Sequence, residues 1–79
     1  MRAKAVLSFV VGELVDHPDE VRIEETEDDR EIVLELTVHP EDLGKVIGKQ
    51  GRTARAIRNL VMAAAQVRQQ RVNVQFVDS

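Results

Sequence analysis

Two glycines placed three residues apart, in the segment Gly48-Lys49-Gln50-Gly51, constrain the fold of this chain more than any other feature. A short apolar segment ends at Ile47, just before them, and an alanine- and arginine-rich helical pattern begins at Arg52. Because glycine has no Cβ, it lets the backbone turn tightly and approach a ligand closely. A turn that feeds a helix N-terminus also presents unpaired N–H groups, which favour anions. The segment therefore predicts a sharp turn that can hold an anion.

Hydrophobic periodicity divides the chain into elements in the order α-β-β-α-α-β. Helices are expected at residues 3–15, 40–47 and 52–68, and strands at residues 21–24, 32–38 and 72–77. The first two strands, joined by a polar turn at residues 25–30, should form an antiparallel hairpin. We therefore expect one α+β domain over residues 1–79, with a three-stranded sheet covered on one face by three helices.

The predicted core follows from the same patterns. In the first helix the expected core stripe is Val6, Phe9, Val10 and Leu14, widened by Ala3, Leu7 and Val11. In the long helix it is Ile57, Leu60, Val61 and Ala64. Phe9 and Phe76 are the two aromatic residues, and both are expected in the core. Since RNA-binding sheets and OB-folds stack bases on exposed aromatics, base recognition here must use an aliphatic groove and hydrogen bonds.

Composition excludes several classes of protein. The chain has no cysteine, so it can form neither a disulfide framework nor a thiolate metal site. No stretch approaches the roughly 20 apolar residues of a membrane span. The N-terminal segment lacks the apolar core and cleavage site of a secretory signal. A cytoplasmic, non-membrane protein is therefore expected.

Charge is divided unevenly along the chain. Residues 1–43 hold four Lys or Arg against thirteen acidic residues, whereas residues 44–79 hold seven against one. Such asymmetry can mark a basic binding face on an acidic protein, although two solvated faces of opposite sign explain it as well.

A row of basic residues follows the turn. Arg52, Arg55 and Arg58 step by three residues, so they lie along one side of the helix, opposite its core stripe. The row continues back to Lys45 and Lys49, which gives one positive track of the kind that follows a phosphate backbone. The alternative is a solvated arginine face.

Known catalytic and metal motifs are absent from the sequence. The glycine spacing fits neither a Walker-type phosphate loop nor a dinucleotide fingerprint. His17 and His39 each precede a proline at an element boundary and lack metal-ligand spacing, so they are interpreted as boundary residues. The acidic residues between Glu24 and Asp29 lack the pattern of a calcium loop. No Asp, Glu, His or Cys occurs from residue 44 to residue 75, so no enzyme, cofactor or small-molecule substrate is expected.

The long helix is apolar around much of its circumference. Ala56, Ala63 and Val67 widen the core stripe, and Met62 falls among the arginines. Two interpretations stay open, a buried central helix and a surface for a partner, most simply a dimer.

These residues resemble a known family. Val46-Ile47-Gly48-Lys49-Gln50-Gly51-Arg52 resembles the V-I-G-x-x-G signature of KH domains, which clamp about four nucleotides of single-stranded RNA or DNA at a GXXG loop. The element order resembles the type II KH fold, which implies a three-stranded mixed sheet covered on one face by three helices. A free-standing KH domain of this length is similar to the KhpA family of small bacterial RNA-binding proteins, and the Pro18-Asp19-Glu20-Val21 segment fits that family too.

The resemblance implies a non-catalytic protein that binds single-stranded RNA, and an RNA chaperone or post-transcriptional regulator that influences cell shape. It implies a homodimer, or a heterodimer with a KhpB-like KH protein. The RNA-binding residues it implies are Lys45, Ile47, Gly48, Lys49, Gln50, Gly51, Arg52 and Arg55. The competing class is a dimerisation module whose contact with RNA is weak or supplied by the partner.

Overall fold

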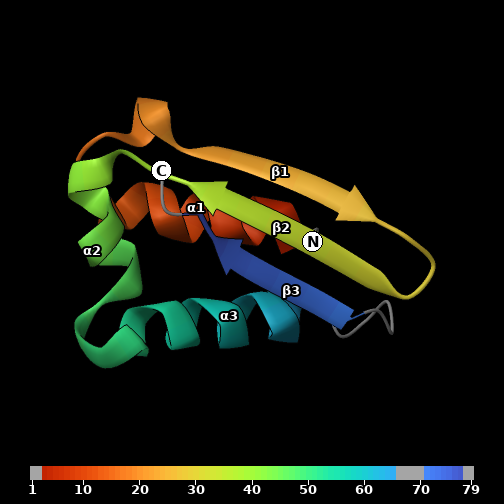
Figure 1. The fold of residues 1–79 in the computed structure, drawn as a ribbon. Coiled ribbons are helices and arrows are strands. Elements are labelled where there is room, and N and C mark those ends of the chain that lie inside the picture. The colour runs from red at the N-terminus through yellow and green to blue at the C-terminus, as the bar shows by residue number, and fades with distance from the viewer. Residues whose placement is uncertain (1–2, 66–70, 78–79) are drawn as a thin grey trace.

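The structure is a computed structural model that describes residues 3–65 and 71–77. The elements follow one another as predicted, α-β-β-α-α-β (Figure 1). They are α1 (Ala3–Leu14), β1 (Arg22–Glu27), β2 (Glu31–Thr37), α2 (Leu43–Ile47), α3 (Arg52–Ala65) and β3 (Arg71–Phe76). Three short 3₁₀ turns join them, η1 (Pro18–Glu20), η2 (Pro40–Asp42) and η3 (Lys49–Gly51).

The strands form one mixed sheet in the order β1-β2-β3. β1 and β2 pair antiparallel, from Arg22 opposite Thr37 to Glu27 opposite Ile32. β2 and β3 pair parallel, with Leu34 opposite Val74. The predicted hairpin and mixed sheet are confirmed, with helices packed against one face of the sheet (Figure 1).

β1 is longer than predicted, and its polar end was wrongly assigned to the turn. Glu25 and Thr26 pair with Leu34 and Val33 on β2, because a neighbouring strand can bind backbone groups whatever the side chains are. The turn shrinks to residues 28–30. There the Asp28 carboxylate accepts hydrogen bonds from the backbone N–H of Arg30 and Glu31, at 2.7 and 2.8 Å, and these bonds lower the pKa of Asp28.

The helix bounds also shift. The expected helix at 40–47 divides into the 3₁₀ turn η2 and the α-helix α2. Proline opens η2, where its missing N–H and fixed φ suit the first position. The expected end of the long helix at residue 68 lies outside the described residues.

The core lies between the sheet and the helices. On β2, alternate residues Ile32, Leu34 and Leu36 are buried, as a strand with one covered face requires. Leu7 and Val11 of α1 and Val61 of α3 are fully buried against them. Ile57, Val46 and Val74 also belong to this core. Val46 is the buried residue of α2, and Leu43 and Ile47 of the same helix pack against the core with part of their side chains.

The predicted core stripe of α1 is correct for Ala3, Leu7 and Val11 and wrong for Phe9 and Leu14. Its buried residues are Ala3, Leu7 and Val11, whereas Phe9 is 71% exposed and Leu14 is 39% exposed. Helical spacing fits both stripes, because α1 is apolar around most of its circumference. The packing of α1 on β2 and α3 selects the stripe that is buried.

Two further core predictions also need correction. Leu60 of α3 is 49% exposed, although Ile57 and Val61 beside it are buried. Phe76 is half-buried and packs against the edge of the core. Leu60 therefore lies outside the core, and only part of the Phe76 side chain contacts it.

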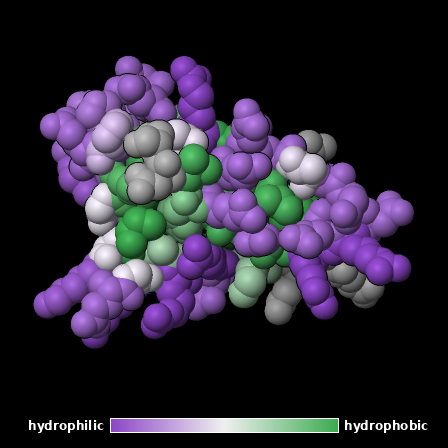
Figure 2. Space-filling view, in the orientation of Figure 1, coloured by the Kyte–Doolittle hydropathy of each residue, from purple (hydrophilic) through white to green (hydrophobic). Residues whose placement is uncertain are grey.

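The other face of the sheet is open to solvent and polar. Glu24, Glu35 and Gln75 lie on it at matching positions of the three strands, and all are exposed. Hydrophilic residues cover most of the face in Figure 2, with hydrophobic atoms gathered in small patches between them. Within the described residues, no helix is long and apolar enough to cross a bilayer.

Candidate nucleic-acid interface

The GXXG loop (residues 48–51) turns the chain sharply from α2 into α3. Gly48 has φ 76° and ψ 175°, and Gly51 has φ 74°. Between them, Gln50 adopts the left-handed conformation with φ 57°, which is uncommon for a residue with a Cβ. Backbone hydrogen bonds from Gly48 N to Gly44 O (2.8 Å) and from Gly51 N to Gly48 O (3.2 Å) hold this turn. Helix α3 begins at Arg52, directly after the loop.

Gly48 lies against Thr53, the second residue of α3. A Cβ on Gly48 would overlap the hydroxyl oxygen of Thr53 and come within 2.7 Å of its Cβ and 2.9 Å of its backbone nitrogen. A Cβ on Gly51 would meet no atom within 4 Å, although its φ still favours glycine. The first glycine is therefore required by both shape and backbone angle, and the second by backbone angle alone.

Three exposed basic side chains surround the loop. Lys49 lies on the loop itself, and Arg52 and Arg55 lie on the first turns of α3. No residue within ranges 3–65 and 71–77 forms an ion pair with them. Their charges are therefore available to an external anion.

Lys45 has a different environment from the one predicted. Its ammonium group binds the Asp16 carboxylate and lies 3.7 Å from an oxygen of Asp42. The hydrogen bond to Asp16 and the charges of both carboxylates raise the pKa of Lys45. The positive track therefore does not extend back to Lys45 as a free charge.

Arg58 also departs from the predicted row. Its Nε donates a 3.2 Å hydrogen bond to the carbonyl oxygen of Val74, and its guanidinium carbon lies 5.0 Å from the ring centre of Phe76. This side chain ties α3 to β3, with a cation–π contact at the edge of the sheet. The free basic row consists of Lys49, Arg52 and Arg55.

Ile47 lies at the end of α2, directly before the loop. It is half-buried and packs against the core, so part of its side chain remains accessible beside the loop. Gln50 and Lys49 are exposed at the tip. The predicted residues 47–52 thus lie together at the turn between α2 and α3. Lys45 differs from them because its charge is paired with Asp16 and Asp42.

Asp42 holds α2 in place, a role that the sequence did not reveal. It is 1% exposed, and its two carboxylate oxygens accept hydrogen bonds from Asp16 N (3.2 Å) and His17 N (2.9 Å). Burial opposes ionisation of this carboxyl, but these hydrogen bonds, with the charges of His17 and Lys45, lower its pKa. The end of α1 and the start of α2 are thereby joined. The only sequence signal was an acid at the start of a helix, which also fits a helix-dipole role.

The prediction that His17 and His39 are boundary residues is correct for their positions. Each precedes a 3₁₀ turn, η1 or η2. The structure adds that their rings stack, with centroids 4.0 Å apart and an interplanar angle of 24°. No sequence spacing indicated this pairing, because it depends on how α1 and β2 end side by side.

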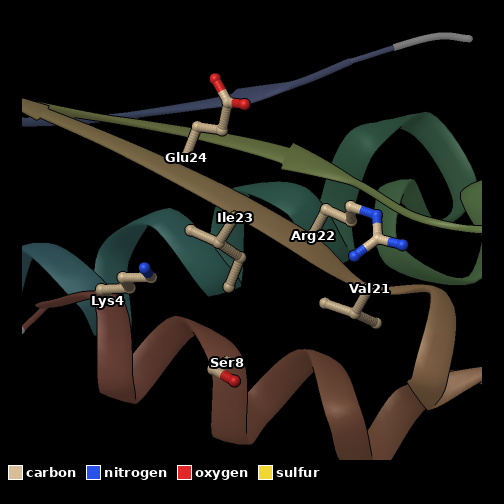
Figure 3. Close-up of a pocket in the computed structure, with 6 residues that line it drawn as sticks. All are labelled: Lys4, Ser8, Val21, Arg22, Ile23 and Glu24. Atoms are coloured by element: carbon tan, nitrogen blue, oxygen red, sulfur yellow. The ribbon is translucent and has the colours of Figure 1, made fainter.

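A separate hollow of about 350 Å³ lies between α1 and β1 (Figure 3). Lys4 and Ser8 line it from α1, and Ile23 points from β1 toward the helix. Glu24 points away from the helix and Arg22 brings a positive charge, so the rim has mixed sign. This hollow lies at the β1 edge of the sheet, whereas the GXXG loop precedes α3, which packs on β3 at the opposite edge.

The element order, the mixed sheet and the GXXG loop between α2 and α3 together define a KH domain of type II. A family model described as KhpA/KhpB, KH domain matches residues 4–76. The chain therefore belongs to the KhpA/KhpB family of KH domains. This membership agrees with the expectation that the chain is not an enzyme.

Similar proteins in three bacteria are named RNA-binding protein KhpA. The one from Halalkalibacterium halodurans is 49% identical over 75 residues, covering 95% of this chain and 99% of that protein. The protein from Bacillus subtilis is 51% identical, covering 92% of this chain and 90% of its own length. For Caldanaerobacter subterraneus the identity is 55%, over 91% of this chain and 96% of the relative.

Proposed function

We propose that this protein binds single-stranded RNA without catalysis, and that the GXXG loop clamps the sugar-phosphate backbone. The observation that carries the proposal is the loop itself, a glycine turn at a helix N-terminus with three free basic side chains beside it. Membership of the KhpA/KhpB family and relatives named as RNA-binding proteins support it.

In this proposal each loop residue has a defined task. Gly48 and Gly51 let the RNA backbone lie close to the protein backbone, because neither has a Cβ. Lys49, Arg52 and Arg55 neutralise phosphates, and Gln50 donates a hydrogen bond to phosphate or sugar. The accessible part of Ile47 lines the groove for the bases. Since the chain has only two aromatic residues, the bases are held by aliphatic contact and hydrogen bonds.

The test replaces both Lys49 and Gln50 by Asp. Two carboxylates at the loop tip should repel phosphate and abolish binding to a single-stranded RNA oligonucleotide, measured by fluorescence anisotropy. The matched control is the double variant Arg22→Asp and Thr26→Asp on β1, which changes the net charge by the same amount. Circular dichroism checks that both variants fold. Equal affinities of the two folded variants would refute the site.

We further propose that the protein acts as a dimer, as an RNA chaperone or post-transcriptional regulator. Phe9 of α1 and Leu60 of α3 are exposed at 71% and 49%, and with Ala5, Val6 and Val10 they line an apolar hollow of about 400 Å³. In a two-fold symmetric dimer, the same apolar patch of each copy would be buried against the other copy. A second copy of this chain is the occupant we propose, with a KhpB-like partner as the alternative.

The dimer proposal is tested by sedimentation equilibrium of the purified protein. Phe9→Glu places a charge in the apolar patch and should give a monomer, because an unpaired buried charge opposes association. Gln75→Glu, on the open face of the sheet, is the matched control and should remain dimeric. A parent protein that sediments as a monomer at micromolar concentration would exclude the homodimer. If that monomer still binds RNA, the RNA-binding proposal stands without the dimer proposal.

A further inference from the structure

Three side chains with metal-binding atoms meet at the end of the sheet near the start of α2. His17 follows α1, His39 follows β2, and Glu41 lies in η2. One ligand atom from each of them lies within 4.8 Å of the other two. His17 is more than twenty residues from His39 and Glu41 in sequence, so the cluster exists only in the folded chain.

The distances in this cluster match those between ligands of a tetrahedral metal ion. Two ligands bound at about 2.1 Å with a tetrahedral angle lie about 3.4 Å from each other. His17 Nε2 is 3.4 Å from Glu41 Oε1, and His39 Nδ1 is 3.7 Å from the same oxygen. One carboxylate oxygen therefore already stands at ligand spacing from two imidazole nitrogens.

One hydrogen bond to His39 sets the tautomer of its neutral ring. Its Nδ1 accepts a 3.0 Å hydrogen bond from the backbone N–H of Glu41, so this nitrogen carries a lone pair. In the neutral ring the proton is then on Nε2, which lies 3.7 Å from a carboxylate oxygen of Glu20. Metal-bound histidines ordinarily donate their second ring N–H to a carboxylate, and Glu20 lies just beyond hydrogen-bond distance of this N–H. Glu20 is thus placed to orient His39 without binding the ion.

We propose that His17, His39 and Glu41 form a binding site for one divalent transition-metal ion of the zinc type. Two imidazoles and one carboxylate are a donor set that suits such an ion, with a fourth position left to water. Magnesium and calcium prefer oxygen ligands, so the same cluster discriminates against them. The site is independent of the GXXG loop and of the RNA-binding proposal.

Binding requires rearrangement of the half-buried His17 and His39 side chains, and the ion must replace the Glu41 N–H at the lone pair of His39 Nδ1. The two rings are stacked, so they must rotate apart until both lone pairs point to the ion. The side chains of His17 and His39 are 37% and 25% exposed, which leaves room for this rotation. The bound ion would join the end of α1 to η2, beside the link that Asp42 makes between the same segments.

The test is calorimetric titration of the full, tag-free chain with Zn²⁺, in the presence and absence of excess Mg²⁺. We expect one ion per chain, unaffected by Mg²⁺, and a higher melting temperature with Zn²⁺, because a ligand that binds only the folded state stabilises it. The variants are His17→Gln and His39→Asn, where Asn can still accept the Glu41 N–H bond. Each should weaken Zn²⁺ binding at least about tenfold and remove the thermal shift.

The control is the double variant Glu25→Gln and Asp29→Asn at the acidic hairpin tip, which should bind Zn²⁺ like the parent. Co²⁺ absorption gives a second readout, since tetrahedral coordination produces visible bands that the His17→Gln variant should lose. Zn²⁺ binding that is absent, or that survives both histidine substitutions in proteins folded by circular dichroism, would overturn the proposal. Loss of binding in the hairpin variant alone would assign the ion to the acidic turn and also refute it.

Discussion

At the scale of the residue, Gly48 is the most constrained of the four glycines. Its φ of 76° and ψ of 175° fall in a region that essentially only glycine occupies. The side chain of Thr53 closes the space where a Cβ would stand. Gly51 shares the positive φ but has open space around it, and Gly44 lies in α2 with no atom near its missing Cβ. Three glycines within eight residues therefore differ in what they do.

We expect three alanine substitutions to separate these roles. Gly48→Ala should destabilise the fold by about 3 kcal/mol or more, because backbone strain and overlap with Thr53 add. Gly51→Ala should cost about 1–2 kcal/mol from backbone strain alone. Gly44→Ala should be neutral or stabilising by about 0.5–1 kcal/mol, since alanine favours a helix. Urea unfolding followed by circular dichroism measures all three, and equal losses at Gly48 and Gly51 would contradict the assigned contact.

At the scale of the element, β1 is an edge strand that carries more charge than its pairing favours. Its sequence from Arg22 to Glu27 includes three glutamates and only one apolar residue. Glu24 lies directly opposite Glu35 of β2 on the open face of the sheet, and like charges at such positions destabilise a sheet. Charge on an edge strand also prevents pairing with other chains. The charges of β1 thus lower the stability of the sheet and also oppose aggregation through this edge.

This pair yields a prediction with an internal control. Replacing Glu35 by Lys should stabilise the fold by on the order of 0.5 kcal/mol, because it creates an opposite-charge pair with Glu24. Glu24→Lys should do the same, and the double variant should return close to the parent because it restores a like-charge pair. Denaturant unfolding of the four proteins forms a double-mutant cycle. Additive gains in the double variant would show that the two side chains do not interact.

At the scale of the whole molecule, the uneven charge of the sequence becomes a spatial division. The acidic hairpin ends at the β1 edge of the sheet, and α3 with its free arginines packs on β3 at the other edge (Figure 1). A chain with a net charge of −3 can therefore present a positive track to RNA. Lys45 is basic in sequence, but its ion pairs with Asp16 and Asp42, where α1 and α2 meet, remove it from the free basic row.

The salt dependence of RNA binding should distinguish Lys49, which has a free charge, from Lys45, which is paired with carboxylates of its own chain. Lys49→Gln should lower the slope of log affinity against log salt by about 0.7, because each neutralised phosphate of a single strand contributes that amount to the slope. Lys45→Gln removes the same charge but should leave the slope unchanged, because Lys45 neutralises carboxylates of its own chain. Fluorescence anisotropy across a salt series measures both slopes. A reduced slope for Lys45→Gln would show that Lys45 does contact phosphate and would contradict this prediction.

The sequence by itself determined the element order, the antiparallel hairpin and the position of the glycine turn. These follow from local rules, since periodicity marks helices and strands and glycine marks positive φ. It also identified the residues next to the turn, Lys49 and Arg52, because neighbours in sequence stay neighbours in a loop. The family resemblance that the turn and element order implied was confirmed by the comparison with known KH domains.

The tertiary structure alone decided which side of an apolar helix is buried and which basic residues are free. Phe9 and Leu60 point outward because the sheet and neighbouring helices occupy the other side, and periodicity cannot distinguish two apolar stripes. The ion pair between Lys45 and Asp16, and the approach of His17 to His39, join segments far apart in sequence. Such contacts depend on the packing of whole elements, so no local pattern of residues encodes them.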